Sequence, residues 1–506
     1  MAADASRSDL TLAVVGTGIM GRGIAQIAAQ AGVRTLLYDS RTGAAQHAKN
    51  HIAQQLARLV DKGRLEAKAA AQAGVNLVVC DSLAALSSCD AVLEAIAEDL
   101  DAKRQLFRAL EPVVGEDCVL ATNTSSLSVT AIASACTRPG RVAGFHFFNP
   151  VPLMKVVEVV DGLLTAPRVG EFLASLAVRL GHQPVRAKDT PGFIVNHAGR
   201  AYGTEALRIV GEGIAEFHDV DRVLRDCAGF RMGPFELLDL TGLDVSHPVM
   251  ESIYRQYYEE PRYRPSPIAA RRVSAGLFGR KSGRGFYGYE GGRQEEIPEV
   301  PAPAARPASV WVSRAGLGAN LVELLRKLGA HIDRGVRPAA QSLCLVAPLG
   351  GDATATALEE ELDPARTLAV DCLLSTDRRR TLMTTPVTTA AMRAAAHGLL
   401  AGDGVPVTVI RDSPGFVVQR MLAQIVNIAA DIAQQGIASP ADIDAAVTLG
   451  LGYPHGPLAW GDAVGAPRIL AILEALHDFY GDPRYRASPW LKRRARLGVS
   501  LLTAET

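Results

Sequence analysis

Short apolar runs alternate with amphipathic segments along the first third of the chain. Helical spacing of apolar residues over 22–31 and 43–73 predicts helices there. The apolar runs that predict strands lie at residues 10–15, 35–38, 76–80, 91–96, 118–121 and 142–148. Because strands that alternate with helices are typical of a doubly wound, mostly parallel sheet, the pattern predicts an α/β domain.

The pattern becomes helical after residue 187. The segment that starts at 189 and includes 205–212 predicts an all-α domain that continues to about residue 289. Residues 296–307 are rich in proline and alanine and show no hydrophobic period, which is typical of a semi-rigid linker.

The second half of the chain repeats motifs of the first. Residues 413–419 (SPGFVVQ) echo 190–196 (TPGFIVN) at an offset of 223 residues, and Gly456-Pro457 echoes Gly233-Pro234 at the same offset. This repeat predicts a duplicated helical domain. The predicted domains are an α/β domain over 1–187, a helical domain over 188–291, a linker over 292–307, a degenerate α/β segment over 308–409 and a second helical domain over 410–506.

A glycine-rich turn joins the first predicted strand to the first predicted helix. It reads Gly16-Thr17-Gly18-Ile19-Met20-Gly21, the fingerprint of a dinucleotide-binding (Rossmann) domain between a strand and a helix. We expect Gly16 to make the tight turn and Gly21 to bring helix and strand close. Gly18, with Ile19 and Met20, should present backbone amides to a pyrophosphate. The alternative is that these glycines serve packing alone.

An acidic residue ends the second predicted strand. Asp39 is placed to accept hydrogen bonds from the ribose hydroxyls of an adenosine and to repel a 2'-phosphate. The sequence therefore predicts NAD rather than NADP as cofactor, although Arg41 weakens that preference slightly.

The degenerate segment lacks the residues that carry this chemistry. Residues 310–318 align with 13–21, but Ser313 and Ala315 replace the two phosphate glycines, and only Gly318 survives. The counterpart of the 142–148 strand, near 367–374, contains no histidine. We expect one active site, in the first copy, and poor dinucleotide binding by the second copy.

One histidine and one glutamate stand out among apolar neighbours. His146 ends the predicted strand 142–148, and Glu158 lies within the apolar run Val-Val-Glu-Val-Val. A buried carboxylate needs a partner, and an imidazole beside one is a good proton acceptor near neutral pH. The alternative is a core histidine with satisfied hydrogen bonds and a glutamate that faces solvent.

Two further strand ends carry polar side chains. Glu98 follows the strand 91–96, and the loop Asn123-Thr124-Ser125-Ser126 follows the strand 118–121. Loops at the carboxyl ends of parallel strands face the ligand crevice of such sheets. The hydroxyls in this loop are equally suited to cap a helix over 127–135.

The composition excludes some partners. Lys+Arg and Asp+Glu both number 53 in 506 residues, so no net charge attracts nucleic acid or an anionic membrane. The seven cysteines are scattered, with no paired spacing that indicates disulfides, and no metal-ligand cluster is evident. The amino terminus has no signal-peptide pattern, and no apolar run reaches spanning length, so we expect a cytoplasmic protein.

These motifs, in this order, resemble the L-3-hydroxyacyl-CoA dehydrogenase family over about residues 8–290 and, more weakly, 308–506. The resemblance implies NAD-dependent oxidation of a (3S)-3-hydroxyacyl-CoA, with His146 as the general base that takes the 3-hydroxyl proton and Glu158 as its orienting group. Ser125 and Asn196 match residues that bind substrate near the reacting oxygen and thioester. The cofactor-contacting positions implied by the resemblance are Glu98, Lys103, Asn149 and Lys281, and Lys62 matches a lysine near the CoA phosphates.

The two-copy layout is similar to the bacterial 3-hydroxybutyryl-CoA or 3-hydroxyadipyl-CoA dehydrogenases of phenylacetate catabolism. Family members with one helical domain commonly dimerise through it, so the second copy is expected to act as a built-in partner, in a monomer or in a further homodimer. Arg200 and Arg231 are candidates for binding a dicarboxylic acyl end. Two other functions stay open: a non-catalytic CoA- or dinucleotide-binding structural protein, and a dehydrogenase for a free hydroxy acid.

Overall fold

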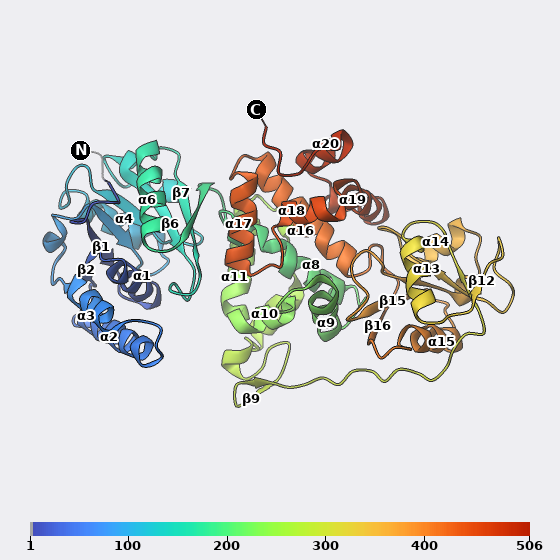
Figure 1. The fold of residues 1–506 in the computed structure, drawn as a ribbon. Coiled ribbons are helices and arrows are strands. Elements are labelled where there is room, and N and C mark those ends of the chain that lie inside the picture. Colours follow the sequence, from blue (N-terminus) through green and yellow to red (C-terminus); the bar gives the residue numbers. More distant parts are fainter. Residues whose placement is uncertain (1–3, 506) are drawn as a thin grey trace. The chain divides into compact units, whose positions relative to one another are not determined.

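The computed structural model describes residues 4–505 and folds into two compact units (Figure 1). The first unit comprises the chain up to residue 197 together with residues 435–451, and the second comprises 198–434 together with the chain from 452 onwards. These units cut across the domains expected from the sequence, whose boundaries stay predictions. Within residues 4–505, no helix is both long and apolar enough to cross a membrane.

An eight-stranded sheet forms the centre of the first unit, in the order β3-β2-β1-β4-β5-β6-β7-β8. All neighbours are parallel except β6 and β7, which are antiparallel. The strands are β1 (Thr11–Val15), β2 (Arg34–Tyr38), β3 (Leu77–Val79), β4 (Ala91–Glu94), β5 (Val119–Thr122), β6 (Val142–Phe147), β7 (Val156–Asp161) and β8 (Gln183–Lys188). The six strands predicted from apolar runs are confirmed, with β4 ending two residues earlier than expected.

Helices cover both faces of this sheet, because its strands are apolar on both sides. Leu12 and Val14 of β1 belong to a core that includes α1 and α6, whereas Ala13 and Val15 belong to a core that includes α4 and α5. The helices are α1 (Ile19–Gln30), α2 (Ala44–Asp61), α3 (Ala67–Asn76), α4 (Leu100–Leu110), α5 (Val129–Ala133) and α6 (Pro167–Arg179). The predicted helix over 43–73 is two helices, because α2 ends at Asp61 and the chain turns at Gly63, which has a φ of +64°.

One helix of the first unit comes from the second half of the sequence. Helix α17 (Pro440–Leu451) packs on β7 and β8. Its buried residues Ile443, Ala446 and Val447 recur at helical spacing and form one face. Just before the helix, the Ile437 carbonyl accepts a hydrogen bond of 2.8 Å from the Lys188 amide at the end of β8.

The second unit contains both copies of the helical region. Helix α8 of the first copy packs on α16 of the second, and the short α7 (Val195–Ala198) leads into α8. A buried carboxylate joins the copies, since Glu205 of α8 binds Arg420 of α16 at 2.6 Å and Arg484 at 2.7 Å. The helices are α8 (Arg200–Gly211), α9 (Phe217–Ala228), α10 (Pro234–Thr241), α11 (Leu243–Gln256), α12 (Pro267–Ser274), α16 (Val418–Gln434), α18 (Pro457–Val464), α19 (Ala466–Tyr480) and α20 (Pro489–Leu497).

The second unit also contains a smaller sheet, in the order β12-β11-β13-β14-β15-β16, drawn in yellow to brown in Figure 1. As in the first sheet, one antiparallel pair, β14 and β15, is followed by a parallel neighbour. The elements are β11 (Val310–Val312), α13 (Gly318–Lys327), β12 (Ile332–Asp333), β13 (Leu343–Val346), α14 (Ala353–Glu359), β14 (Thr367–Val370), β15 (Arg380–Thr384), α15 (Ala390–Leu400) and β16 (Val407–Ile410). The expected fold class, a dinucleotide-binding Rossmann domain and an all-α domain followed by a degenerate Rossmann-like segment and a repeat of the all-α domain, is confirmed.

The duplication extends to backbone conformation. Gly192 and Gly415, which are equivalent in the repeat, have φ values of +79° and +73°, and the following Phe193 and Phe416 both have +49°. A phenylalanine at positive φ is uncommon, so the shared value indicates that the same turn is built twice. This turn positions the candidate active site in the first unit.

Candidate active site

The antiparallel pair β6 and β7 brings the histidine and the glutamate together. His146 and Glu158 are directly opposite in the strand register, and Nδ1 of the histidine lies 2.6 Å from Oε2 of the glutamate. Both side chains are buried, with 5% and 0% exposed. Because a carboxylate only accepts hydrogen bonds, Nδ1 carries a proton and donates it, which leaves Nε2 as the acceptor. The alternative of a solvent-facing Glu158 is therefore wrong.

The turn after β8 fixes the other oxygen of Glu158. The backbone amides of Ile194 and Val195 donate to Oε1 at 2.9 and 2.8 Å. The ring of Phe193, the preceding residue, packs against the His146 ring with centroids 5.8 Å apart. Three hydrogen bonds thus hold this carboxylate in one orientation and compensate for its burial.

Asn196 connects this turn to the Ser125 loop. Its Nδ2 donates to the Ser125 carbonyl at 3.3 Å. Asn123, at the start of the same loop, accepts a hydrogen bond of 2.8 Å from the Phe147 amide, next to His146. The structure therefore brings together the four predicted catalytic residues. Asn123, which was not predicted as a site residue, adds a hydrogen bond between this loop and β6.

Glu98 organises the loop that contains Ser125. Its Oε1 accepts hydrogen bonds from the Thr124 hydroxyl at 2.6 Å and from the amides of Ser125 and Ser126 at 2.9 and 3.1 Å. Burial would raise the pKa of Glu98, but the Lys103 ammonium and these donors outweigh burial and hold the pKa below its usual value. The loop hydroxyls thus bind Glu98, while Ser128 caps the following helix α5.

Lys103 is buried between two carboxylates. Its Nζ lies 2.6 Å from Glu94 and 3.3 Å from Glu98, and its side chain is 1% exposed. Glu94 also accepts a hydrogen bond of 2.6 Å from the Thr122 hydroxyl. Glu94 was not among the residues predicted from the sequence, although an acidic residue in a buried strand is a signal that could have identified it. Lys103 therefore acts on the site indirectly, because its ammonium group holds Glu98 in position.

The glycine-rich turn has the geometry that a dinucleotide requires. A Cβ atom at Gly16 would lie 2.6 Å from the Ala95 carbonyl oxygen, and one at Gly21 would lie 1.9 Å from the Gly16 carbonyl oxygen. Gly18, at the N-terminus of α1, faces open space. The backbone of α1 therefore packs directly against the backbone of the glycine-rich turn, and the N-terminal amides of α1 stay accessible to a pyrophosphate.

Asp39 lies at the end of β2, beside this turn. The amide and the hydroxyl of Thr17 both donate to its Oδ2 at 2.8 Å, and Arg41 donates to Oδ1. Burial would raise the pKa of Asp39, but the Thr17 and Arg41 donors outweigh burial and bring it to about 2. A fixed negative charge at this position suits ribose hydroxyls and repels a 2'-phosphate.

The other predicted ligand positions are spread over both units. Ile19 and Asn149 line one cavity of about 330 Å³ in the first unit, and Lys62 follows the last residue of α2 as an exposed side chain. Met20, in the first turn of α1, is partly buried and packs against the core. Lys281 belongs to the second unit, where its Nζ lies 2.6 Å from Asp244. Cofactor contact by Lys281 and CoA contact by Lys62 stay predictions.

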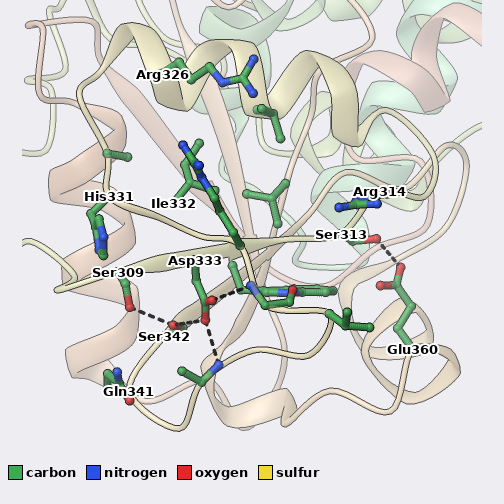
Figure 2. Close-up of a pocket in the computed structure, with 18 of the residues that line it drawn as sticks. Ser309, Ser313, Arg314, Arg326, His331, Ile332, Asp333, Gln341, Ser342 and Glu360 are labelled. Atoms are coloured by element: carbon green, nitrogen blue, oxygen red, sulfur yellow. Dashed lines mark hydrogen bonds between the residues drawn. The ribbon is translucent and has the colours of Figure 1, made fainter.

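A cavity of about 1240 Å³ lies at the equivalent turn of the second sheet (Figure 2). The register predicted from sequence is correct, since a Cβ atom at Gly318 would lie 2.0 Å from the Ser313 carbonyl oxygen, as Gly21 does with Gly16. Figure 2 shows the Ser313 hydroxyl directed at Glu360, to which it donates at 2.7 Å. A carboxylate beside this turn would repel a pyrophosphate, which agrees with the expectation of poor dinucleotide binding.

The second copy also has a counterpart of the His146–Glu158 pair. Val370 of β14 pairs with Leu382 of β15, so the next residue, Asp371, lies opposite Thr381. Asp371 thus occupies the position equivalent to His146. Asp371 accepts a hydrogen bond of 3.0 Å from Gln419, the equivalent of Asn196. Burial raises the pKa of Asp371 to about 6. Asp371 replaces the imidazole, so the histidine base proposed for the first copy has no equivalent at this position.

Comparisons with known proteins agree with this geometry. The family model for the NAD-binding domain of 3-hydroxyacyl-CoA dehydrogenase matches residues 11–190. The model for the C-terminal domain of 3-hydroxyacyl-CoA dehydrogenase matches residues 192–289 and again 415–500, one match for each helical copy.

Individual relatives cover either the whole chain or its first half. The 3-hydroxyadipyl-CoA dehydrogenase of Escherichia coli K12 is 39% identical over 96% of this chain and 98% of its own length. The human mitochondrial hydroxyacyl-coenzyme A dehydrogenase is 40% identical over 55% of this chain and 90% of its own length. A solved 3-hydroxybutyryl-CoA dehydrogenase from Escherichia coli K12 superposes with a TM-score of 0.86 at 38% identity, over 97% of this chain and 98% of its own. The chain therefore belongs to the 3-hydroxyacyl-CoA dehydrogenase family of NAD-dependent oxidoreductases.

Proposed function

We propose that this chain oxidises short-chain or dicarboxylic (3S)-3-hydroxyacyl-CoA thioesters at one active site, with His146 as the general base. The observation that supports the proposal most is the hydrogen bond of 2.6 Å between His146 and Glu158, two buried side chains. This bond fixes the tautomer in which Nε2 accepts a proton. The two amides that bind Glu158 keep the ring oriented while the proton is transferred.

The reaction divides between the cofactor and the chain. NAD, when bound, accepts the hydride that leaves C3 of the substrate. His146 takes the proton of the 3-hydroxyl group at Nε2 and becomes an imidazolium, whose charge Glu158 stabilises. A positioned general base contributes about 10² to 10⁴-fold in rate. Ser125 and Asn196 are proposed to bind the reacting oxygen and the thioester, and the 3.3 Å hydrogen bond between them supports a shared position.

The cofactor residues are proposed from their places around the β-strand ends. Gly16, Gly18 and Gly21, with Ile19 and Met20, would hold the pyrophosphate at the start of α1, and Asp39 would bind the adenosine ribose. Glu98 and Asn149 are proposed to contact the nicotinamide half, with Lys103 acting through Glu98 because its ammonium is buried. Lys281 is a further cofactor contact, and Lys62 a contact to the CoA phosphates.

Exchange of His146 for glutamine tests the base. Because glutamine keeps a polar side chain but cannot take up a proton at neutral pH, we expect His146→Gln to bind NAD normally and to lose at least about 10²-fold in kcat. The matched control is His47→Gln, which changes an exposed histidine of α2 in the same unit. Near-normal turnover of His146→Gln would refute the mechanism.

The assay also separates the competing functions. Purified protein is mixed with acetoacetyl-CoA and NADH, and the nicotinamide absorbance is followed. No turnover with any acyl-CoA would favour a non-catalytic binding protein, and turnover of a free 3-oxo acid that free CoA does not inhibit would favour a hydroxy-acid dehydrogenase.

The acyl group is the least defined part of the proposal. The two-copy relatives are named for 3-hydroxyadipyl-CoA and 3-hydroxybutyryl-CoA, so a dicarboxylic and a short monocarboxylic substrate are compared by kcat/KM. If the acyl end is dicarboxylic, Arg200→Gln or Arg231→Gln should reduce kcat/KM for 3-hydroxyadipyl-CoA at least about tenfold while leaving 3-hydroxybutyryl-CoA unchanged. Equal losses for both substrates would remove these arginines as acyl-end contacts. A role in phenylacetate catabolism and a cytoplasmic location belong to the same proposal.

A further inference from the structure

Helix α17 contacts the segment that holds the catalytic pair. It packs on β7, which carries Glu158, and on β8, which leads into the turn at Phe193. Its buried face is formed by Ile443, Ala446 and Val447, and the half-buried Gly450 follows one turn later. This helix comes from the second half of the chain, which lacks the residues proposed for catalysis.

Gly450 of α17 lies against the catalytic turn. A Cβ atom at this position would lie 2.9 Å from Cγ2 and 3.2 Å from Cγ1 of Val195, and 3.5 Å from Cγ1 of Val156. Gly450 lies in the last turn of α17, so the restriction on a larger residue there comes from the contact with Val195. Even one methyl group would have to displace Val195.

Val195 is one step away from the proposed base. Its amide donates to Oε1 of Glu158 at 2.8 Å, and Oε2 of Glu158 binds His146 at 2.6 Å. The next residue, Asn196, donates to the Ser125 carbonyl. A displacement that reaches the Val195 backbone would move both the carboxylate that orients the base and the Asn196 side-chain amide proposed to bind substrate.

We propose that Gly450 is a positioning residue for the dehydrogenase reaction, and that α17 is the part of the duplicated half that completes the active site. The inference rests on the proposed role of His146 and Glu158. Displacement by about 1 Å at a distance from the chemistry can cost up to about 10²-fold in rate, so the expected effect falls on kcat rather than on cofactor binding.

The repeat supplies a matched control. Cys227 of α9 is the equivalent of Gly450 at the offset of 223 residues, and its Sγ contacts the Arg379 carbonyl beside β15. Thr381 and Asp371 take the places of Glu158 and His146 there. A larger side chain at Cys227 therefore disturbs the same type of helix–sheet contact at a place that has no catalytic pair.

The experiment compares the full-length variants Gly450→Ala, Gly450→Val and Cys227→Val. We expect kcat with acetoacetyl-CoA and NADH to fall about threefold for Gly450→Ala and at least about tenfold for Gly450→Val. The dissociation constant of NADH should stay within about twofold for all three, and kcat of Cys227→Val should stay within about twofold of the unaltered chain. Adding Val195→Ala to Gly450→Ala removes the clashing methyl groups and should restore most of kcat.

The outcomes separate this inference from the proposed function. An unaltered chain without acyl-CoA turnover refutes the proposed function, whereas an active unaltered chain with a fully active Gly450→Val refutes the positioning role alone. A loss of kcat that is equal in Cys227→Val, or that Val195→Ala does not rescue, indicates general destabilisation and also overturns the inference. If Gly450→Val does not fold, Gly450→Ala and its rescue by Val195→Ala decide the question.

Discussion

Replacement of Glu158 by glutamine exchanges one carboxylate oxygen for an NH2 group. This exchange reverses the direction of the hydrogen bond to His146. The carboxylate accepts three hydrogen bonds, from the amides of Ile194 and Val195 and from Nδ1 of His146. A glutamine has a single carbonyl oxygen, which can keep the two backbone amides. Its NH2 group then faces Nδ1, which must become an acceptor. The proton moves to Nε2, the atom proposed to take the substrate proton.

The expected loss follows from these contacts. A hydrogen bond to a charged group is worth about 1.5–3 kcal/mol, and this one strengthens when His146 becomes an imidazolium. At about 1.36 kcal/mol for each tenfold change in rate, its loss alone costs about 10 to 10²-fold. The wrong tautomer removes part of the general-base contribution as well, so we expect kcat of Glu158→Gln to fall at least about 10²-fold.

The assay is the NADH-dependent reduction of acetoacetyl-CoA, with thermal unfolding and NADH binding measured on the same samples. Glu171→Gln, at an exposed position of α6, is the control for removal of one negative charge from the same unit. Because Glu158→Gln keeps both backbone hydrogen bonds, we expect its unfolding temperature to change little. A folded Glu158→Gln with kcat within about threefold of the unaltered chain would refute the orienting role.

Three further predictions concern charges with shifted pKa values. Asp39→Asn should reduce the preference for NAD over NADP at least about tenfold in kcat/KM, because the carboxylate that repels the 2'-phosphate is lost. Asp371→Asn should raise the free energy of unfolding at pH 8 and leave it nearly unchanged at pH 4. Burial raises the pKa of Asp371 from 3.8 to about 6, so its stabilising effect is present below 3.8 and lost as the pH rises through 6. For Glu205, burial raises the pKa, but Arg420 and Arg484 outweigh it and bring the pKa from 4.5 to about 2. Urea unfolding should therefore show a contribution of Glu205 above pH 4.5 that disappears as the pH falls to about 2, and Glu205→Gln should remove this dependence.

The strands and the duplication were predictable from the sequence because they depend on local patterns. Apolar runs between turn residues gave the strands of the first sheet, and the repeated TPGF and SPGF turns gave two copies with the same backbone conformation at Phe193 and Phe416. The position of α17 was not predictable in this way. Its period identifies a buried face, but periodicity does not say which surface covers that face, and here it is a sheet more than 250 residues earlier in the sequence.

The site was predictable to the extent that burial made a side chain conspicuous. Glu158 interrupts an apolar strand, so its need for a partner was evident, and the antiparallel register supplies His146. Asn123 was missed because its partner, the Phe147 amide, comes from another element and follows no local spacing. The acidic residue at the end of the buried strand β4 was a signal for Glu94, but its partner Lys103 also comes from another element. Contacts of this kind depend on how the ends of different strands are arranged in space, and local sequence patterns do not predict that arrangement.

The parts that the second copy has kept indicate what the duplication is for. Among the described residues its sheet has six strands where the first has eight, and no helix corresponds to α2 or α3. Glu360 lies beside the former phosphate turn, so the cofactor side is reduced. It has kept the β14-β15-β16 arrangement and the turn at Phe416, the parts equivalent to those that α17 contacts in the first copy. Loss of cofactor features with retention of packing features is expected if the second copy was selected as a scaffold. A chain that ends at residue 290 would lack α17 and leave the apolar faces of β7 and β8 exposed, so we expect it to lose activity even though every proposed catalytic residue is present.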